Sequence, residues 1–351
     1  MSIMEKVNIK KISELSGFSP ATVSNALNNK RGVNSQTAEK ILAIARELGY
    51  AKDEKIKNIQ LVIYHDSGKV VSDVPFFTSL LDALSNASHK KGYATKLINL
   101  YRNDDDYEEQ LRAVLQDVSS AILLVGTELD AESAKRFLQA EMPLVLLDCS
   151  FQRLPFNAIL MDNANAMRQA VDYLVLLGHK DIGYLHSETP TQVFEARRHG
   201  YIDAMQEHGL LIDKDFCFGM PVSITEAYNY FNEILAKQPE LPTAFLAAND
   251  MIAIGVMQAL QKNNIKVPED ISIIGFDDIE ISSVMAPGLT TVKVDTWEMG
   301  QMAVRRLLNL IKQPQKMPAR VELYTELMVR GSTAAPPKRE KGVAIQCQAE
   351  K

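Results

Sequence analysis

Short apolar runs that alternate with amphipathic helical patterns across residues 59–330 constrain the fold of this chain more than any other feature. Between the runs, apolar residues recur at three- and four-residue spacing, as in Met167, Ala170, Val171 and Leu174. This alternation is typical of buried parallel sheets covered by helices on both faces. It predicts an α/β body of two doubly wound parallel-sheet subdomains, with a cleft at the carboxyl ends of the strands. The strand-like runs are 59–65, 94–101, 121–126, 144–150, 158–162, 181–186, 243–249, 270–278 and 291–295.

The first fifty residues have a different pattern, that of an all-α module of three short helices. Asn8 is a suitable cap for the first helix, and Gly17 ends it. Ser19 followed by Pro20 is typical of a second helix start, and Asn34 begins a third. Because the first two helices are short and joined by a tight turn, they form a helix-turn-helix pattern. In that motif the second helix enters the major groove of DNA.

The outward face of the second helix is polar or small, which suits contact with DNA. Asn25 offers a bidentate hydrogen bond to an adenine edge, and Thr22 and Ser24 offer hydroxyls to phosphates. Pro20 and Ala21 can read a base only through apolar contact. The alternative on pattern alone is a three-helix bundle that binds no nucleic acid.

Charge is distributed unevenly along the chain. Residues 1–57 carry ten Lys and Arg against six Asp and Glu, a net charge of +4. Because the net charge of the whole chain is −6, the remaining residues carry −10. A basic front joined to an acidic body favours a polyanion partner for the front alone. The alternative is that this modest excess is a solvated face.

Two motif groups carry a resemblance to a known family. SPATVSNALN, GVNSQTAEKIL and ELGY lie within a stretch that resembles the headpiece of the LacI/GalR (lactose-repressor) family of bacterial transcription regulators. The resemblance implies base reading by Pro20, Ala21 and Asn25. It implies contacts to the DNA backbone by Ser19, Thr22, Ser24, Asn28 and Asn34.

The junction after Tyr50 departs from that family. The family's Pro-Asn pair and its Ala-Arg-Ser-Leu hinge helix, whose leucine wedges into the minor groove, are replaced by the short charged segment 51–58. The sequence therefore predicts a linker without a hinge helix and an operator bent less than is usual, because a kink needs an intercalated apolar side chain. Lys52, Lys55 and Lys57 retain the chemistry to follow phosphates.

The body, residues 59–331, is similar to the family's effector-binding and dimerisation core, which resembles periplasmic sugar-binding proteins. The matching motifs include FFTSLL, LVLLD, EARRHGY, AANDM and GFDD. Guanidinium and carboxylate groups bind arrays of sugar hydroxyls, and aromatic rings cover an apolar ring face. The alternative is that Arg197 and Asp277 only pair with each other. The effector-binding residues that the resemblance implies are Phe76, Phe77, Asp148, Arg197, Asn249 and Asp277.

Other classes of protein find little support in the sequence. No nucleophile elbow, P-loop, zinc-protease motif or ligand spacing for a metal occurs, so no enzyme, cofactor or metal site is expected. No apolar run is long enough to span a bilayer, and no signal peptide is evident, so a cytoplasmic location without membrane contact is expected. Residues 332–351 contain two prolines and no periodicity, which predicts a disordered tail without a tetramer-forming heptad helix.

These features predict a homodimeric transcriptional repressor that binds double-stranded DNA at a pseudo-palindromic operator and responds to a small carbohydrate effector. One alternative is a cytoplasmic sugar-binding sensor with weak or no operator binding, favoured by Pro20, Ala21 and the missing hinge. An enzyme on the same α/β scaffold is the third hypothesis, which no catalytic motif supports.

Overall fold

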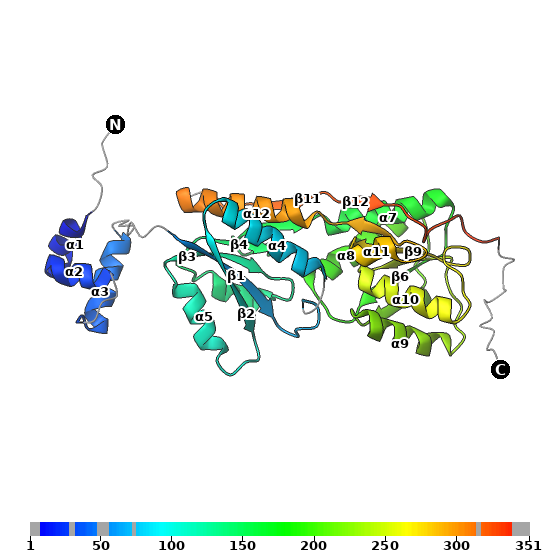
Figure 1. Cartoon of the computed structure of the whole chain (residues 1–351), viewed down its shortest axis with the longest axis horizontal. Coiled ribbons are helices and arrows are strands. Elements are labelled where there is room, and N and C mark those ends of the chain that lie inside the picture. Colours follow the sequence, from blue (N-terminus) through cyan, green and yellow to red (C-terminus); the bar gives the residue numbers. More distant parts are fainter. Residues whose placement is uncertain (1–7, 28–31, 48–55, 72–74, 314–316, 339–351) are drawn as a thin grey trace, which may run out of the picture. The chain divides into compact units, whose positions relative to one another are not determined.

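A computed structural model describes residues 8–27, 32–47, 56–71, 75–313 and 317–338 of the chain. It divides into two compact units, residues 1–55 and 56–351. Figure 1 shows the course of the chain.

The first unit consists of three helices around a small apolar core. They are α1 (Ile9–Ser16), α2 (Pro20–Leu27) and α3 (Ser35–Glu47). The Asn8 side chain accepts a hydrogen bond from the Lys11 backbone N–H at 3.0 Å, and Gly17 ends α1 with a left-handed φ of 73°. The core consists of Ile12, Val23, Ala26, Ile41 and Ala45. The prediction of a three-helix module is confirmed for the described residues.

The second unit contains two six-stranded sheets, each the centre of one subdomain. In the first subdomain the strand order is β11-β5-β4-β3-β1-β2, and all neighbouring strands are parallel. Leu61 in β1, the second strand from one edge, pairs with Leu97 of β2 on one side and Leu123 of β3 on the other. The strands are β1 (Asn58–His65), β2 (Ala94–Tyr101), β3 (Ser120–Val125), β4 (Leu144–Leu147), β5 (Asn157–Met161) and β11 (Arg320–Leu323).

Helices cover both faces of this sheet (Figure 1): α4 and α12 lie on one side and α5 on the other. Alternate residues of β1 explain this, because Ile59, Leu61 and Ile63 join one buried apolar cluster while Val62 and Tyr64 join another. The helices are α4 (Pro75–Lys90), α5 (Tyr107–Gln116), α6 (Ala131–Phe137) and α12 (Thr296–Lys312).

The second subdomain repeats the arrangement with the order β12-β10-β9-β8-β6-β7, in which only β12 runs antiparallel to its neighbour. Its strands are β6 (Ile182–Ser187), β7 (Cys217–Met220), β8 (Ala244–Ala247), β9 (Ser272–Asp277), β10 (Thr290–Lys293) and β12 (Glu326–Met328). Its helices are α7 (Asn163–Leu177), α8 (Gln192–Glu207), the 3₁₀ turn η1 (Lys214–Phe216), α9 (Ile224–Leu235), α10 (Asp250–Lys262) and α11 (Glu280–Val284).

The chain passes between the subdomains three times, after β5, β10 and β11. Two of these crossings are hydrogen-bonded to each other, since the Asp162 N–H donates to the Leu323 carbonyl at 2.9 Å. Two sheets with helices on both faces, built from alternating strands and helices, confirm the fold class predicted from the sequence.

Three strands and part of the tail differ from the sequence prediction. The short strands β7, β11 and β12 were not predicted, because their residues are largely half-buried or exposed and lack an apolar run. The prediction of a disordered tail from residue 332 onward was also wrong for residues 332–338. Ser332 is fully buried, and its backbone carbonyl accepts the Ile273 N–H of β9 at 2.8 Å. The Ala334 N–H donates to Ser272 Oγ at 3.0 Å. Residues 339–351 lie outside the described part.

Candidate nucleic-acid interface and interdomain site

The start of α2 is organised by Ser19. Its hydroxyl accepts a hydrogen bond from the Thr22 N–H at 3.1 Å and lies 2.9 Å from the Thr22 hydroxyl. Pro20 occupies the first helical position, where the missing N–H costs nothing. This cap fixes the direction in which the helix leaves the turn.

The predicted DNA-binding residues lie on the side of α2 away from the core. Val23 and Ala26 are buried in the three-helix core, whereas Ser19, Pro20 and Ala21 are exposed. The side chains of Thr22, Ser24 and Asn25 are half-buried. A short, capped helix with small and polar residues on its outer face fits the major groove without a steric obstacle. Asn28 lies outside the described residues.

Asn34 is exposed, and its side-chain oxygen accepts the Thr37 N–H at 2.7 Å. This bond caps α3, as the sequence indicates. The helix start that this cap exposes carries N–H groups of the kind that bind phosphate.

In the second unit, the motif Arg-x-x-Gly-Tyr on α8 brings a guanidinium to the boundary between the subdomains. Gly200 allows close contact with α7, because a Cβ there would lie 2.2 Å from the Ala164 carbonyl oxygen. The Tyr201 hydroxyl donates to the Ile182 carbonyl at 2.7 Å and ties α8 to β6. One turn earlier, Arg197 lies with only 5% of its surface exposed.

Every edge of the Arg197 guanidinium has a partner. Nε donates to the Asn163 side-chain oxygen at 2.9 Å and Nη1 to the Ala248 carbonyl at 2.6 Å. Nη2 lies 3.3 Å from Asp277 Oδ1. The guanidinium carbon lies 3.6 Å from the centre of the Phe276 ring, a cation–π distance. The residues that hold Arg197 thus come from α7, β9 and the end of β8.

Two buried aspartates flank this guanidinium at the carboxyl ends of strands in different subdomains. Asp277 ends β9, and Asp148 directly follows β4. The pKa of Asp277 is raised to about 6. Burial is the largest cause, the Asp148 charge raises the pKa further, and the Arg197 charge opposes both by lowering it. Burial likewise raises the pKa of Asp148 to about 6, against the Thr127 hydrogen bond and the Arg197 charge. The three charges are therefore close enough to influence one another across the subdomain boundary.

The backbone at both aspartates is unusual for residues with a side chain. Asp148 has a φ of 60° and Asp277 a φ of 113°. Positive φ values at non-glycine residues cost about 1–3 kcal/mol and cluster at functional sites. Thr127 donates to Asp148 Oδ2 at 2.6 Å and fixes the orientation of that carboxylate.

Asn249 and Asp250 begin α10 immediately after the carbonyl that binds Arg197. The Asn249 side chain caps the helix by accepting the Ile252 N–H at 2.9 Å. Asp250 is fully buried and accepts bonds from the Thr291 hydroxyl at 2.5 Å and the Ser282 hydroxyl at 2.7 Å. Burial and the nearby Asp277 charge raise the pKa of Asp250 to about 7. Asp250 thus ties the loop after β9 to α10.

The predicted aromatic pair, Phe76 and Phe77, lies at the start of α4 in the first subdomain. The two rings make an edge-to-face contact with centroids 5.0 Å apart, and both are buried in the larger apolar cluster. Among the described residues, no hydrogen bond or ring contact joins this pair to Arg197 or Asp277. The structure thus brings Arg197, Asp277, Asp148 and the Asn249 helix start into one charged group. Among the described residues, the aromatic pair takes no part in the hydrogen bonds of this group.

Sequence reasoning missed the side chains that orient this group, namely Asn163, Thr127 and Asp250. The Asn163 side chain bridges the Met161 carbonyl, at 3.1 Å, and Arg197. Thr127 and Asn163 lie two residues after a strand end and Asp250 lies three residues after one, but this position alone does not distinguish them from other residues at strand ends.

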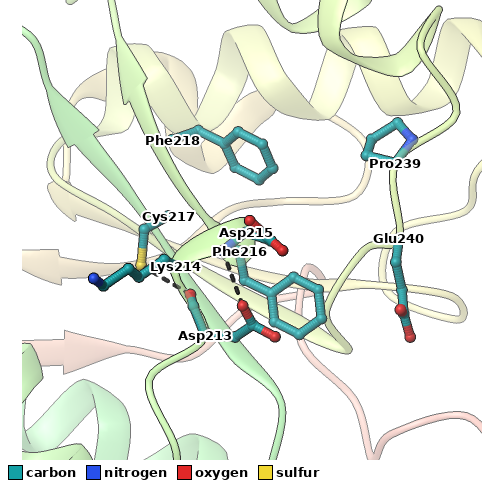
Figure 2. A pocket seen from close by; sticks show the side chains of 8 residues that line it. All are labelled: Asp213, Lys214, Asp215, Phe216, Cys217, Phe218, Pro239 and Glu240. Atoms are coloured by element: carbon teal, nitrogen blue, oxygen red, sulfur yellow. Dashed lines mark hydrogen bonds between the residues drawn. The ribbon is translucent and has the colours of Figure 1, made fainter.

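A surface cavity of the second unit lies elsewhere. It has a volume of about 450 Å³ and is lined by η1, by the start of β7, and by Pro239 and Glu240 in the connection between α9 and β8. Figure 2 shows the rings of Phe216 and Phe218 together with the carboxylates of Asp213, Asp215 and Glu240 around it. It includes none of the predicted effector residues, whose side chains are nearly excluded from solvent in this arrangement.

In the described part of the chain, no three His, Cys, Asp or Glu side chains gather as metal ligands. None of the described helices combines the length and apolar character that a bilayer crossing requires.

Comparison with known proteins identifies both units. Residues 8–53 match the family described as "Bacterial regulatory proteins, lacI family", and residues 171–333 match "Periplasmic binding protein-like domain". The HTH-type transcriptional repressor PurR of Pasteurella multocida is 30% identical over 327 residues, covering 92% of this chain and 98% of the relative. The ribose operon repressor of Escherichia coli K12 is 30% identical over 332 residues, covering 92% and 99%.

A solved structure extends the likeness to three dimensions. The crystal structure of the Lac repressor dimer bound to operator and the anti-inducer ONPF has a TM-score of 0.70 and 25% identity, covering 94% of this chain and all of that one. The relatives are repressors that span nearly the whole chain. They confirm the sequence prediction of a DNA-binding regulator rather than an enzyme.

Proposed function

This chain belongs to the LacI family of bacterial transcriptional regulators, and on that premise we propose that it is a dimeric repressor whose operator affinity is set by a small carbohydrate bound between its two subdomains. The headpiece reads DNA through α2. Two headpieces in one dimer read the two halves of a pseudo-palindromic operator. Because its target is chromosomal DNA, the protein acts in the cytoplasm.

The single observation that carries the ligand site is the buried charge group of Arg197, Asp148 and Asp277. Two carboxylates and one guanidinium lie together with almost no solvent contact, and both carboxylates have raised pKa values. Such a group is costly for stability, so its retention favours a functional role. Sugar hydroxyls can accept from guanidinium N–H groups and donate to carboxylate oxygens, so a ligand can replace part of the bonding that Arg197 and Asp277 make with each other.

The same group suggests how a ligand controls DNA binding. Arg197 and Asp277 belong to the second subdomain and Asp148 to the first, so a ligand held by all three fixes how the two subdomains lie. A ligand shifts such an equilibrium only by its difference in affinity between the two arrangements. The headpieces are attached to the first subdomains of the dimer, so their spacing changes with that arrangement.

Asn25, Pro20 and Ala21 are proposed to contact bases, and Ser19, Thr22, Ser24, Asn28 and Asn34 to contact the DNA backbone. The exposure of Ser19, Pro20, Ala21 and Asn34 supports these roles, as does the position of the half-buried Thr22, Ser24 and Asn25 on the side of α2 away from the core. For the effector, Phe76 and Phe77 are proposed to form the apolar wall, and Asn249 to add a polar contact.

The test compares Arg197→Ala with Arg198→Ala, its neighbour, whose side chain is 50% exposed and pairs only loosely with Glu195 at 3.8 Å. An operator is first selected from random duplexes. Its binding is then measured by fluorescence anisotropy with D-ribose, other neutral pentoses and hexoses, and their phosphorylated forms. The unsubstituted protein and R198A should respond to one of these ligands by about tenfold or more, and R197A should not respond. A normal response in R197A would remove Arg197 from the effector site.

The alternative, a sugar sensor that has lost its operator, predicts a different result. Binding to selected and random duplexes would then be equally weak and would fall equally with salt, because phosphate contacts alone would remain. A selected duplex that outcompetes random DNA at both low and high salt excludes this alternative.

A further inference from the structure

Glu128, in the turn after β3, holds the loop that follows β1. Its Oε2 accepts the backbone N–H groups of Asp66 at 2.8 Å, Ser67 at 2.7 Å and Gly68 at 2.9 Å. Its Oε1 accepts the Val70 N–H at 2.9 Å, and the Ser67 hydroxyl adds a fifth bond at 3.2 Å. Four successive or nearly successive N–H groups around one carboxylate make an anion-binding nest that is filled from within the protein.

The turn that carries Glu128 also orients the effector-site carboxylate. The preceding residue, Thr127, donates to Asp148 at 2.6 Å. Gly126 leaves no room for a side chain, because a Cβ there would lie 2.5 Å from the Cys149 sulfur. Three consecutive residues therefore join the ends of β3 and β4 to the loop after β1.

The loop held by Glu128 contributes to the same apolar cluster as the proposed aromatic wall. Val70 and Val71 are each 5% exposed, and they share one buried cluster with Phe76 and Phe77. Fixing the Val70 backbone therefore fixes part of the apolar cluster to which the aromatic pair belongs.

We propose that Glu128 is a positioning residue of the effector site. Its carboxylate fixes residues 66–71 and, through Val70 and Val71, the apolar wall formed by Phe76 and Phe77. Thr127 beside it orients Asp148. This inference rests on the proposed function, because it assigns a purpose to the wall that the effector would contact. It makes ligand affinity depend on a residue that does not itself touch the ligand.

The bonds to Glu128 require a charged carboxylate. Burial raises the pKa of Glu128, but the N–H groups of Val70, Gly68, Asp66 and Ser67 together hold it below its ordinary value. The ionised form is therefore the one that the loop selects. A neutral amide of the same shape has one acceptor oxygen in place of two, and its NH₂ group meets the loop's N–H groups donor to donor.

A second tie to the loop is weaker. Arg102 lies 3.1 Å from Asp66 and 2.8 Å from Asp130, but the three side chains are 42–48% exposed. Exposed ion pairs of this kind contribute little. Glu128 is thus the principal anchor, and replacing it should release the loop despite Arg102.

The experiment compares Glu128→Gln with Glu132→Gln in the full chain. Glu132 is a matched control in the first turn of α6, four residues after Glu128, with a side chain 80% exposed and an ion pair to Lys135. Hydrogen exchange followed by mass spectrometry reports on residues 66–71. The Phe77→Trp substitution, made together with Trp297→Phe, reports on the wall through the tryptophan emission maximum and its quenching by acrylamide.

E128Q should speed exchange at residues 66–70 by about tenfold or more, shift the emission of the tryptophan to the red and raise its quenching. E132Q should change neither. Faster exchange with an unchanged reporter would overturn the proposal, because Glu128 would then hold only a surface loop. Unchanged exchange would overturn it as well.

A titration separates this proposal from the proposed function. D-ribose, D-glucose and cellobiose are the probes, and binding is measured by calorimetry. For any of them that the unsubstituted protein binds, E128Q should weaken the Kd by about tenfold, the factor that corresponds to about 1.4 kcal/mol, and E132Q should leave it unchanged. If E128Q leaves the Kd unchanged, the positioning role is wrong. If the unsubstituted protein binds none of them, that counts against the proposed function, whereas exchange and emission still decide the role of Glu128.

Discussion

Replacing Asp148 with asparagine should make the protein more stable at neutral pH, although Asp148 is proposed to bind the effector. The carboxylate is fully buried, and burial raises its pKa from 3.8 to about 6. In the unfolded chain it ionises near its ordinary value. Between these two pH values the folded protein keeps a proton that the unfolded chain has lost, so stability falls as the pH rises toward 6 and then levels off.

The size of the effect follows from the two pKa values. A pKa difference of one unit corresponds to about 1.4 kcal/mol, so the ionised carboxylate costs the folded state up to about 3 kcal/mol above pH 7. D148N removes this cost, keeps the shape of the side chain and retains an oxygen that can accept the Thr127 hydroxyl. It also removes the Asp148 charge that raises the pKa of Asp277, so the gain is not confined to one residue.

Urea unfolding of the unsubstituted protein, D148N and the exposed-site control D105N, from pH 4 to pH 8, measures this directly. At pH 4 the free energies of unfolding of all three should agree within about 1 kcal/mol, since Asp148 is then protonated in the folded state and only about half ionised in the unfolded chain. At pH 7.5 D148N should be more stable by about 2–3 kcal/mol, near 4–12 °C in Tm for a body of this size. Parallel pH profiles for D148N and the unsubstituted protein would refute the reasoning, because the buried charge would then carry no cost.

Three other predictions concern packing and DNA. Gly200→Ala should lower the free energy of unfolding by about 1–3 kcal/mol, because the alanine Cβ would lie 2.2 Å from the Ala164 carbonyl oxygen. Urea unfolding measures this, and an unchanged free energy would show that α7 and α8 can separate freely. Asn25→Ala should weaken binding to the selected operator by about 1–3 kcal/mol with little change in binding to random DNA, as measured by anisotropy; equal losses on both would assign Asn25 to the phosphates. Operator bending, measured by circular-permutation gel shift, should be small because the junction lacks an intercalating leucine; a large bend would contradict this reading of residues 51–58.

The sequence was sufficient for the architecture because its strongest signals are local. Residues of β1, β3 and β4 are buried on both faces, so their runs are almost wholly apolar and easy to recognise. The caps at Asn8, Ser19 and Asn34 obey local hydrogen-bonding rules, and the structure has each of them. β7, β11 and β12 have no such signal, since they form only by pairing with strands distant in sequence.

The candidate site divides in the same way. Arg197 and Asp277 stand out because their motifs are specific, and the structure pairs them. Thr127, Asn163 and Glu128 could not be predicted, because each acts on a residue 21 to 62 positions away through contacts that only the fold creates. The tail after residue 331 was misjudged for a related reason. Its composition is that of a disordered segment, yet Ser332 completes the hydrogen bonding of Ile273 at 2.6 Å and of Thr290 at 2.8 Å.

In the proposed function, a ligand between the subdomains changes the hold of the headpieces on DNA through Arg197. Anisotropy titrations of the selected operator, with and without the active sugar, test this coupling for the unsubstituted protein, R198A and R197A. The sugar should change the operator Kd about tenfold or more in the first two proteins and leave it constant in R197A. A sugar that changes the Kd of all three equally, or of none, would contradict it.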